Sequence, residues 1–319
     1  MRAYIIRRML QFIPVIIGIT FLVYSTTLML PGDPVYALAG LNVGQTEYTP
    51  EQIERYRKDL GLNDPIPIQY VNWLKNAARG DFGESTRTRR PVTEEVTPRL
   101  KVTLELSVAS LLVATLVGLP AGIAAALWRD TLVDRLITVV SVAGVAVPSF
   151  WLGIMMILLF SVRLQWLPPS GFVSIFDDPV RGLKLLTMPA IILGTGGAAI
   201  LTRQTRSAML EVLNQDYIRT ASAKGLSGRS VVWLHALKNA MLPIITIIGL
   251  FVGNLLAGAA IVETIFAIPG LGRLLVASIG IRDFPVIQLL VLIVAVSTVV
   301  ATLLTDVAYA MLDPRIRYR

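Results

Sequence analysis

The sequence lacks cysteine altogether and contains a single histidine, His235, among its 319 residues. Without cysteine there are no disulfide bonds, thiolate metal sites or thiol nucleophiles. One histidine cannot build a metal site that needs several. The chain also lacks the Gly-x4-Gly-Lys-Ser/Thr loop that cradles nucleotide phosphates, so ATP hydrolysis is not expected here. We therefore expect no catalytic residues, no metal and no cofactor in this chain.

Charged residues are scarce as well, at 16% of the chain, whereas 54% of the residues are hydrophobic. A soluble domain of this size would rarely keep its surface wet with such a composition. A spanning helix needs roughly 20 apolar residues to cross about 30 Å of hydrocarbon. Six stretches meet or approach that length: 9–30, 100–128, 136–162, 185–201, 242–266 and 285–312. The sequence predicts an all-α integral membrane protein with six transmembrane helices.

The first stretch follows three arginines and could be a secretory signal, but it is long and has no small-x-small cleavage site before Pro31. We interpret it as a retained first helix. The net charge of +8 does not come from one basic patch interleaved with aromatics, as a nucleic-acid surface would require, so no nucleic-acid partner is expected.

The basic residues instead indicate the orientation in the membrane. If the first helix starts in the cytoplasm, fourteen lie in cytoplasmic segments: Arg2, Arg7, Arg8, Arg129, Arg135, Arg203, Arg206, Arg219, Lys224, Arg229, Lys238, Arg315, Arg317 and Arg319. The two short outer loops hold only Arg181, Lys184, Arg273 and Arg282. This bias places both termini in the cytoplasm. The predicted units are the N-terminus with the first helix at 1–30, an extracytoplasmic domain at 31–99, a transmembrane domain at 100–312 and a cytoplasmic tail at 313–319.

The extracytoplasmic domain between the first two spans carries its own helix signals. Thr49, Pro50 and Gln52 form the pattern of an N-cap, a first-turn proline and a capping-box partner. Ile53, Tyr56 and Leu60 would share one face of this helix, which Gly61 ends. A second helix is predicted around 69–76. The region is either a solvated spacer or a small external platform for a partner protein.

Few charges lie near the membrane. Lys101 and Glu105, one helical turn apart, are expected to pair at the interface. Glu263 and Asp306 lie near the ends of the fifth and sixth spans. An ion-coupled carrier usually places ionisable groups near the midplane. The sequence shows no such cluster, which argues against an ion-coupled secondary transporter. An intramembrane hydrolase would need a nucleophile and a base together, but the chain has no cysteine and its one histidine, His235, lies in a cytoplasmic loop.

The cytoplasmic connection at 203–241 is much longer than usual between packed helices. Asp216 can cap a short helix that ends at Gly225, where a left-handed backbone favours glycine. Ser227 can cap the following helix, whose predicted apolar positions are Val231, Val232, Leu234, Leu237 and Met241. The small residues at 220–223 could enter a groove on a partner while Arg219 and Lys224 pair with acids. Alternatively, the same helix could rest on anionic lipid.

Residues 219–225 (Arg-Thr-Ala-Ser-Ala-Lys-Gly) and 235–243 (His-Ala-Leu-Lys-Asn-Ala-Met-Leu-Pro) resemble the coupling loop of binding-protein-dependent ABC importer permeases. Arg219 and Thr220 stand where the broad family has Glu and Ala. In this departure the sequence resembles the B-type subunit of the dipeptide and oligopeptide branch. Further motifs of that subunit are Pro-Gly-Asp-Pro at 31–34, Leu-Gly-Leu at 60–62, Gly-Asp-Phe-Gly at 80–83, Val-Glu-Thr-Ile-Phe at 262–266, Pro-Gly-Leu-Gly at 269–272 and Leu-Asp-Pro-Arg-Ile-Arg-Tyr at 312–318.

The resemblance implies the type I ABC importer permease fold in a bacterial plasma (inner) membrane. It implies a heterodimer with a second, related permease, two cytoplasmic ATPases that bind ATP and Mg, and an extracytoplasmic solute-binding protein. The expected cargo is a dipeptide or oligopeptide, with glutathione, nickel or oligosaccharide as alternatives. The residues expected to couple to the ATPases are Asp216, Tyr217, Arg219, Thr220, Ala221, Ser222, Ala223, Lys224, Gly225, Leu226, His235 and Asn239. His235 is expected to pack near the ATPase without a catalytic duty.

Overall fold

The structure, a computed structural model, describes residues 2–28, 35, 49–59 and 61–312. Regular structure in these ranges is helical, apart from an isolated β-bridge between Glu84 and Pro91. The helices are α1 (Arg2–Leu28), α3 (Pro50–Asp59), α4 (Ile66–Ala77), α5 (Val92–Leu127), α6 (Leu132–Ala146), α7 (Ser149–Met156), η1 (Ile157–Arg163), α8 (Pro179–Leu213), α9 (Asp216–Ala223), α10 (Gly228–Ser230), η2 (Val231–Ala236), α11 (Leu237–Ile265), α12 (Leu271–Ile281) and α13 (Phe284–Leu312). Both η elements are π-helices.

Five helical segments in the described part of the chain are long and apolar enough to cross a membrane. They lie in α1, α5, α8, the continuous stretch from α10 to α11, and α13. A sixth crossing is possible only if the pair formed by α6 and by α7 with η1 counts as one span, because this pair is bent by 101°. The prediction of an all-helical membrane protein is confirmed, and the number of spans is five or six.

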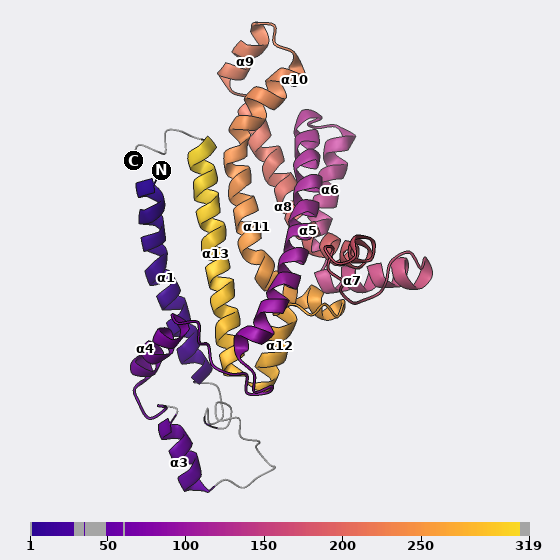
Figure 1. Cartoon of the computed structure of the whole chain (residues 1–319). Coiled ribbons are helices and arrows are strands. Elements are labelled where there is room, and N and C mark those ends of the chain that lie inside the picture. Colours follow the sequence, from indigo (N-terminus) through magenta and orange to yellow (C-terminus); the bar gives the residue numbers. More distant parts are fainter. Residues whose placement is uncertain (1, 29–34, 36–48, 60, 313–319) are drawn as a thin grey trace.

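The third predicted span, at 136–162, is not one straight helix. It breaks at Val147, which is extended at ψ 123°, and Pro148 follows it. The proline has no amide hydrogen for the helix ladder, and its ring pushes the preceding residue away from the α conformation. As a result α7 and η1 turn away from the direction of α6 and lie sideways next to the upright helices (Figure 1).

The fourth predicted span, at 185–201, is much shorter than the helix that contains it. α8 covers 35 residues because the polar residues after Leu201 continue the helix instead of starting a loop. The expected cytoplasmic connection at 203–241 is consequently the last turns of α8, then α9, α10, η2 and the first turn of α11. α5 likewise begins at Val92, inside the region expected to be wholly extracytoplasmic.

The centre of the bundle is the packing of α5 against α8, and small residues let the two backbones approach closely. A Cβ at Gly122 of α5 would lie 2.5 Å from the Cβ of Thr205 and 2.6 Å from the carbonyl oxygen of Thr202. α11 also packs against α8, where a Cβ at Gly197 would lie 2.5 Å from the Phe251 ring. This tight core fixes the direction in which α8 leaves the bundle toward α9.

The two ends of the molecule carry different elements (Figure 1). α9 and α10 project at one end, and α3 and α4 lie toward the other. α1 begins and α13 ends on the α9 side of the bundle. Successive long helices therefore run alternately away from and toward the α9 end, as in a multi-pass membrane protein (Figure 1).

The predicted capping box of the first outer helix is confirmed. The amide of Gln52 donates to the Thr49 hydroxyl oxygen at 3.3 Å, and the Thr49 amide donates to Oε1 of Gln52 at 2.9 Å. Gly61 after this helix has a φ of +66°, whereas Leu60 lies outside the described residues. The second outer helix, α4, contains the predicted stretch 69–76 and extends it at its N-terminal end.

Candidate coupling site

The helix predicted after Asp216 exists as α9, but Asp216 is not its cap. Gln215 occupies the N-cap position without a side-chain hydrogen bond, and Asp216 is the first helical residue. Its carboxylate, on a side chain that is 96% exposed, lies 3.5 Å from the Arg219 guanidinium one turn ahead. An acid in the first turn still favours the helix because the free amides there carry partial positive charge.

The predicted turn after α9 is confirmed at Gly225, which has a φ of +79°. The amides of Gly225 and Leu226 donate to the carbonyl oxygens of Ser222 and Ala221, closing the end of the helix. Ser227 then caps α10, since its hydroxyl oxygen accepts from the amide of Ser230 at 3.3 Å. The chain thus reverses its direction between α9 and α10 over residues 224–227.

Within the part of the chain that the structure describes, two side chains of α9 are buried. Ile218 and Ala221 are buried in a cluster with Met209 of α8 and with Val231 and Ala236 of η2. The remaining predicted coupling positions of this segment are exposed: Asp216, Tyr217, Arg219, Thr220, Ser222, Ala223, Lys224, Gly225 and Leu226. Ala221 packs on its own chain, so its side chain is not among those that α9 presents outward, and the coupling role of the segment stays a prediction.

The apolar face predicted for the following helix is also partly wrong. Leu234 is 66% exposed, and its neighbour Trp233 is 54% exposed. The buried residues are Val231, Ala236 and Ala240. Their spacing of five and then four follows from the wider turn of the π-helix η2, whose hydrogen bonds span five residues and shift the buried face.

Trp233 and Leu234 line a shallow pocket of about 580 Å³ together with Ser227, Arg229 and Ser230. Trp233 is the residue that sequence reasoning missed, since a tryptophan in an apolar stretch gives no sign of its exposure. His235 is half-buried, and Asn239 donates from Nδ2 to the His235 carbonyl oxygen at 2.7 Å. α9 and α10, with Gly225 between them in the chain, lie at the same end of the molecule (Figure 1), and the pocket residues belong to Ser227, α10 and η2.

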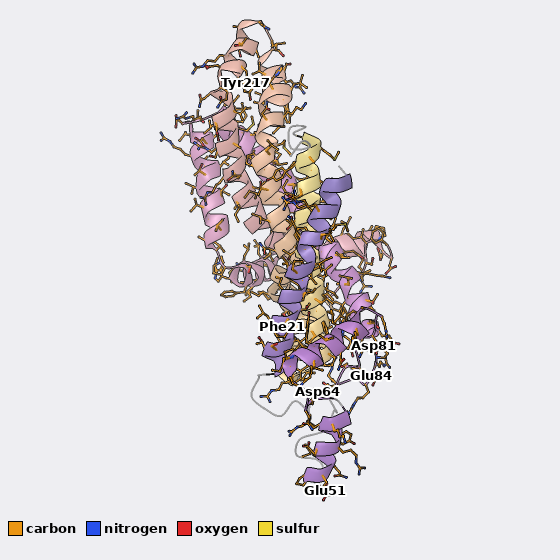
Figure 2. The ribbon with its side chains drawn as sticks, turned by 90° about the vertical axis from the view of Figure 1, so that its left-hand side faces the viewer. Phe21, Glu51, Asp64, Asp81, Glu84 and Tyr217 are labelled. Carbon is orange, nitrogen blue, oxygen red and sulfur yellow. The ribbon has the colours of Figure 1, made fainter. Side chains whose placement is uncertain are left out.

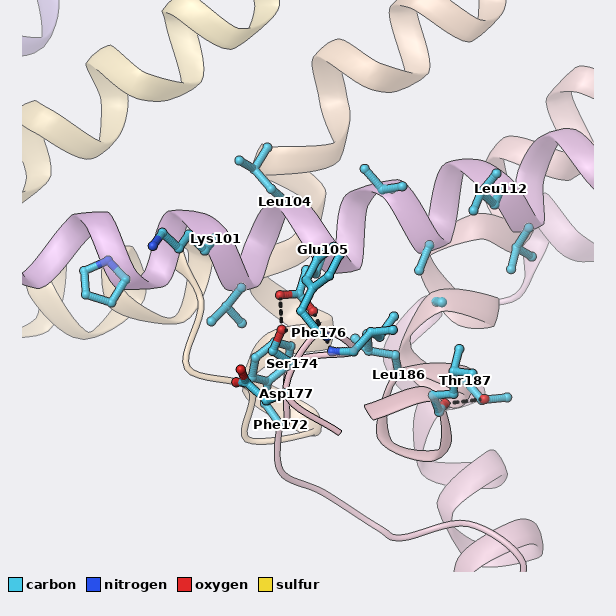
Figure 3. Close-up of a pocket in the computed structure, with 18 of the residues that line it drawn as sticks. Lys101, Leu104, Glu105, Leu112, Phe172, Ser174, Phe176, Asp177, Leu186 and Thr187 are labelled. Atoms are coloured by element: carbon cyan, nitrogen blue, oxygen red, sulfur yellow. Dashed lines mark hydrogen bonds between the residues drawn. The ribbon is translucent and has the colours of Figure 1, made fainter. Parts of the chain in front are cut away.

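A larger cavity of about 1080 Å³ lies between α5, α8 and the segment that precedes α8 (Figure 3). Its wall is mainly apolar, with Lys101, Glu105 and Asp177 among the lining residues. Glu105 accepts from the Ser174 hydroxyl at 2.7 Å and from the Ile175 amide at 3.1 Å. The expected pair between Lys101 and Glu105 is not among the ion pairs of the described residues, and the carboxylate instead accepts from these two groups on the connecting segment.

Glu263 is fully buried and fixes the reversal from α11 into α12. Its Oε1 accepts from the Thr103 hydroxyl at 2.6 Å, and Thr103 Oγ1 in turn accepts from the Leu271 amide at 2.8 Å. The other carboxylate oxygen accepts from the Arg273 amide at 2.9 Å. Gly270 is required at this turn, since a Cβ there would lie 2.1 Å from Oε1 of Glu263.

Comparison with known proteins identifies the family. Residues 1–107 match the family "Binding-prot-dependent transport system membrane comp, N-term", and residues 118–318 match "Binding-protein-dependent transport system inner membrane component". The chain is 43% identical to the dipeptide transport system permease protein DppB of Escherichia coli K12, and the alignment covers the whole of both chains. It is 43% identical to the oligopeptide transport system permease protein AppB of Bacillus subtilis, again with both chains fully covered.

The glutathione transport system permease protein GsiC of Escherichia coli K12 is 42% identical, with 99% of each chain covered. Among solved structures, a chain of the MetNI methionine ABC transporter in an inward-facing conformation superposes with a TM-score of 0.57 at 16% identity. That match covers 68% of this chain and 96% of the other, and it shows the fold alone. The chain belongs to the family of binding-protein-dependent transport system inner membrane components, as the non-catalytic permease subunit of an ABC importer.

Proposed function

We propose that this chain forms half of the channel of an importer for dipeptides and oligopeptides. Its full-length relatives are named for dipeptides, oligopeptides and glutathione, and glutathione is a modified tripeptide. One cargo chemistry, a short amide chain with charged groups at its ends, covers all three. Cargo selection between them would rest mainly with the binding protein that delivers it.

The proposed partners are a second, related permease, two cytoplasmic ATPases and an extracytoplasmic solute-binding protein. In this assembly α9 contacts an ATPase, and the termini lie on the same cytoplasmic side. The placement of the α1 start and the α13 end on the α9 side supports that orientation (Figure 1). Residues 31–99 would then lie on the outer side of the membrane, up to the outer turns of α5.

The observation that carries the coupling proposal is the combination of an exposed helix with a backbone turn that only glycine adopts cheaply. α9 presents Tyr217, Thr220 and Ser222 outward, and Gly225 at φ +79° sets the direction of the next helix. Ile218 holds the opposite side of α9 to the bundle through the buried cluster. A push on α9 would therefore reach α8 and α11 directly through packed side chains.

The test is uptake by vesicles that contain this chain with its partner permease and ATPases. Radiolabelled dipeptide should accumulate only when ATP is inside and the binding protein is outside. A protonophore should leave the initial rate unchanged while ATP is replenished. Uptake that collapses with the protonophore would refute the ATP-driven mechanism, and retention of nickel or an oligosaccharide in place of peptides by the binding protein would refute the cargo.

A further inference from the structure

The outer helix α4 is docked side-on against the membrane span in α1. Tyr70 of α4 is 5% exposed, and its hydroxyl oxygen lies 2.7 Å from Oγ1 of Thr20. The same hydroxyl donates to the carbonyl oxygen of Ile17 at 3.0 Å. Figure 2 shows α4 crossing α1 close to Phe21.

Aromatic rings strengthen this crossing. The Tyr70 ring contacts Phe21 edge-on with centroids 5.2 Å apart, and Tyr24 lies 5.9 Å from both Tyr70 and Trp73. At the start of α4, Gln69 is 9% exposed and donates from Nε2 to the Asp64 carbonyl oxygen at 2.7 Å. The orientation of α4 on α1 is therefore held by both packing and buried hydrogen bonds.

The crossing lies along the C-terminal half of the apolar span of α1. The apolar span in α1 runs from Arg7 to Thr26, so the hydrogen-bonded carbonyl of Ile17 is near its middle. With a rise of 1.5 Å per residue, Phe21 and Tyr24 lie about 3 to 8 Å inside Thr26. Amphipathic helices that lie flat on a membrane sink their apolar side about 5 to 10 Å into the boundary between headgroups and acyl chains.

The side of α4 that faces away from α1 has the pattern of such a helix. Ile68 is 50% exposed and Val71 is 45% exposed. Lys75 is exposed on the same stripe, seven residues after Ile68, and Arg79 follows one turn beyond it. Apolar side chains at this depth suit acyl chains, and the two cations that follow suit phosphate groups.

A neighbouring protein helix has a better place on the other side of α1. Phe12, Val15 and Ile19 form a groove of about 370 Å³ with α13. At 100° per residue these positions point roughly half a turn away from those that contact α4. The outward side of α4 thus continues the exposed surface of α1 that faces lipid, where only 11% of the span is buried.

We propose that α4 is an interfacial helix that binds the lipid leaflet on the α3 side of the membrane. Ile68 and Val71 contact acyl chains, and Lys75 and Arg79 bind the phosphates of lipid headgroups. The helix thereby fixes the outer end of α1 and holds α3 at a set height above the bilayer.

Spin labels test the depth, since the chain has no native cysteine to remove. Ile68→Cys and Val71→Cys, each carrying a nitroxide, are compared with Arg55→Cys on the exposed side of α3, in the assembled complex in vesicles. At positions 68 and 71 collisions with oxygen should exceed those with a water-soluble nickel chelate several-fold, and at 55 the order should reverse. Nickel access at 68 and 71 equal to that at 55 overturns the proposal. Exclusion of both reagents overturns it too, because a protein partner would then cover the helix.

Charge reversal tests the headgroup contact. The variant Lys75→Glu with Arg79→Glu is compared with Arg55→Glu with Lys58→Glu, which makes the same charge change on α3. Vesicles containing phosphatidylglycerol should raise the unfolding temperature over pure phosphatidylcholine in the wild-type and α3 variants, and the α4 variant should lose this gain. Equal gains in both variants, or the same gain from inorganic phosphate alone, would overturn a lipid site at α4.

Discussion

Asp134 of α6 and Arg206 of α8 form a two-pronged ion pair, with Nε 2.6 Å from Oδ1 and Nη2 2.7 Å from Oδ2. The Asp134 side chain is 5% exposed, and its Oδ2 also accepts from the Asp130 amide at 3.0 Å. Arg206 lies about two turns before α8 ends and the chain enters α9. The pair therefore ties α6 to the part of α8 that carries the candidate coupling site.

Breaking this pair from the arginine side should be costly. Arg206→Ala leaves the Asp134 carboxylate buried without its cation, and we expect a loss on the order of 3 kcal/mol in the free energy of unfolding. Adding Asp134→Asn should recover part of that loss, because no uncompensated charge then remains. Thermal unfolding of the purified chain measures both effects.

The exposed pair of Arg129 and Asp130 gives the matched control, with side chains 56% and 78% exposed. Arg129→Ala should change stability by less than about 1 kcal/mol. A loss as large as that of Arg206→Ala would mean that the buried geometry of the Asp134 pair is not what matters.

Gly225→Val should separate coupling from folding. A β-branched residue at a φ of +79° costs about 1 to 2 kcal/mol locally, whereas its Cβ would meet no atom within 4 Å. The variant should insert normally yet lose binding-protein-stimulated ATP hydrolysis and uptake, and Gly225→Asn should keep more of both because asparagine tolerates this conformation.

Gly228 supplies the comparison, since it too is exposed and open around its Cβ but does not have a positive φ. Gly228→Val should retain coupled uptake. If Gly225→Val retains wild-type uptake in the assembled complex, this turn does not transmit the force.

Glu263→Ala should loosen the reversal between α11 and α12. The change leaves the Arg273 amide and the Thr103 hydroxyl without their acceptor, and each orphaned group costs about 1 to 3 kcal/mol. Glu263→Gln keeps one acceptor oxygen and should lose less. Thermal unfolding should rank wild type, Glu263→Gln and Glu263→Ala in that order, with the exposed neighbour variant Thr264→Ala close to wild type. Equal stability of all four would remove Glu263 from this role.

Cysteine labelling tests the orientation of the chain. Lys58→Cys on α3 and Arg229→Cys on α10 both replace exposed residues at opposite ends of the molecule. An impermeant thiol reagent applied to intact cells, with any outer barrier opened, should label position 58 and not 229. The reverse pattern would invert the proposed topology.

Removal of α3 tests the role of the outer region. Deleting residues 49–62 takes away α3 and the Gly61 turn but leaves α4 with its Tyr70 contacts to α1. We expect normal insertion together with weaker stimulation of ATP hydrolysis by the binding protein, because the deleted helix lies at the end of the molecule opposite α9 (Figure 1). Unchanged uptake kinetics at all binding-protein concentrations would make this segment a spacer.

The amino-acid sequence by itself determined the features that depend on local chemistry. Apolar stretches of sufficient length have no stable place outside lipid, so the membrane class followed from composition. Three such features are the Thr49 capping box, the left-handed turn at Gly225 and the Ser227 cap. Each one involves only residues that are at most four positions apart in the chain. Their geometry is decided by the backbone and one side chain, and a sequence pattern therefore predicts it.

Only the tertiary structure decided how distant residues meet. Asp134 and Arg206 are 72 positions apart, and Thr103 and Glu263 are 160 apart, so no local pattern pairs them. Pro148 breaks the helix for a local reason, but the 101° angle between the two parts and the π-helical turn that exposes Leu234 are not read from a local pattern. The buried carboxylates Asp134 and Glu263 need partners because lipid offers none, and which partner each one finds depends on how α5, α6, α8 and α11 pack.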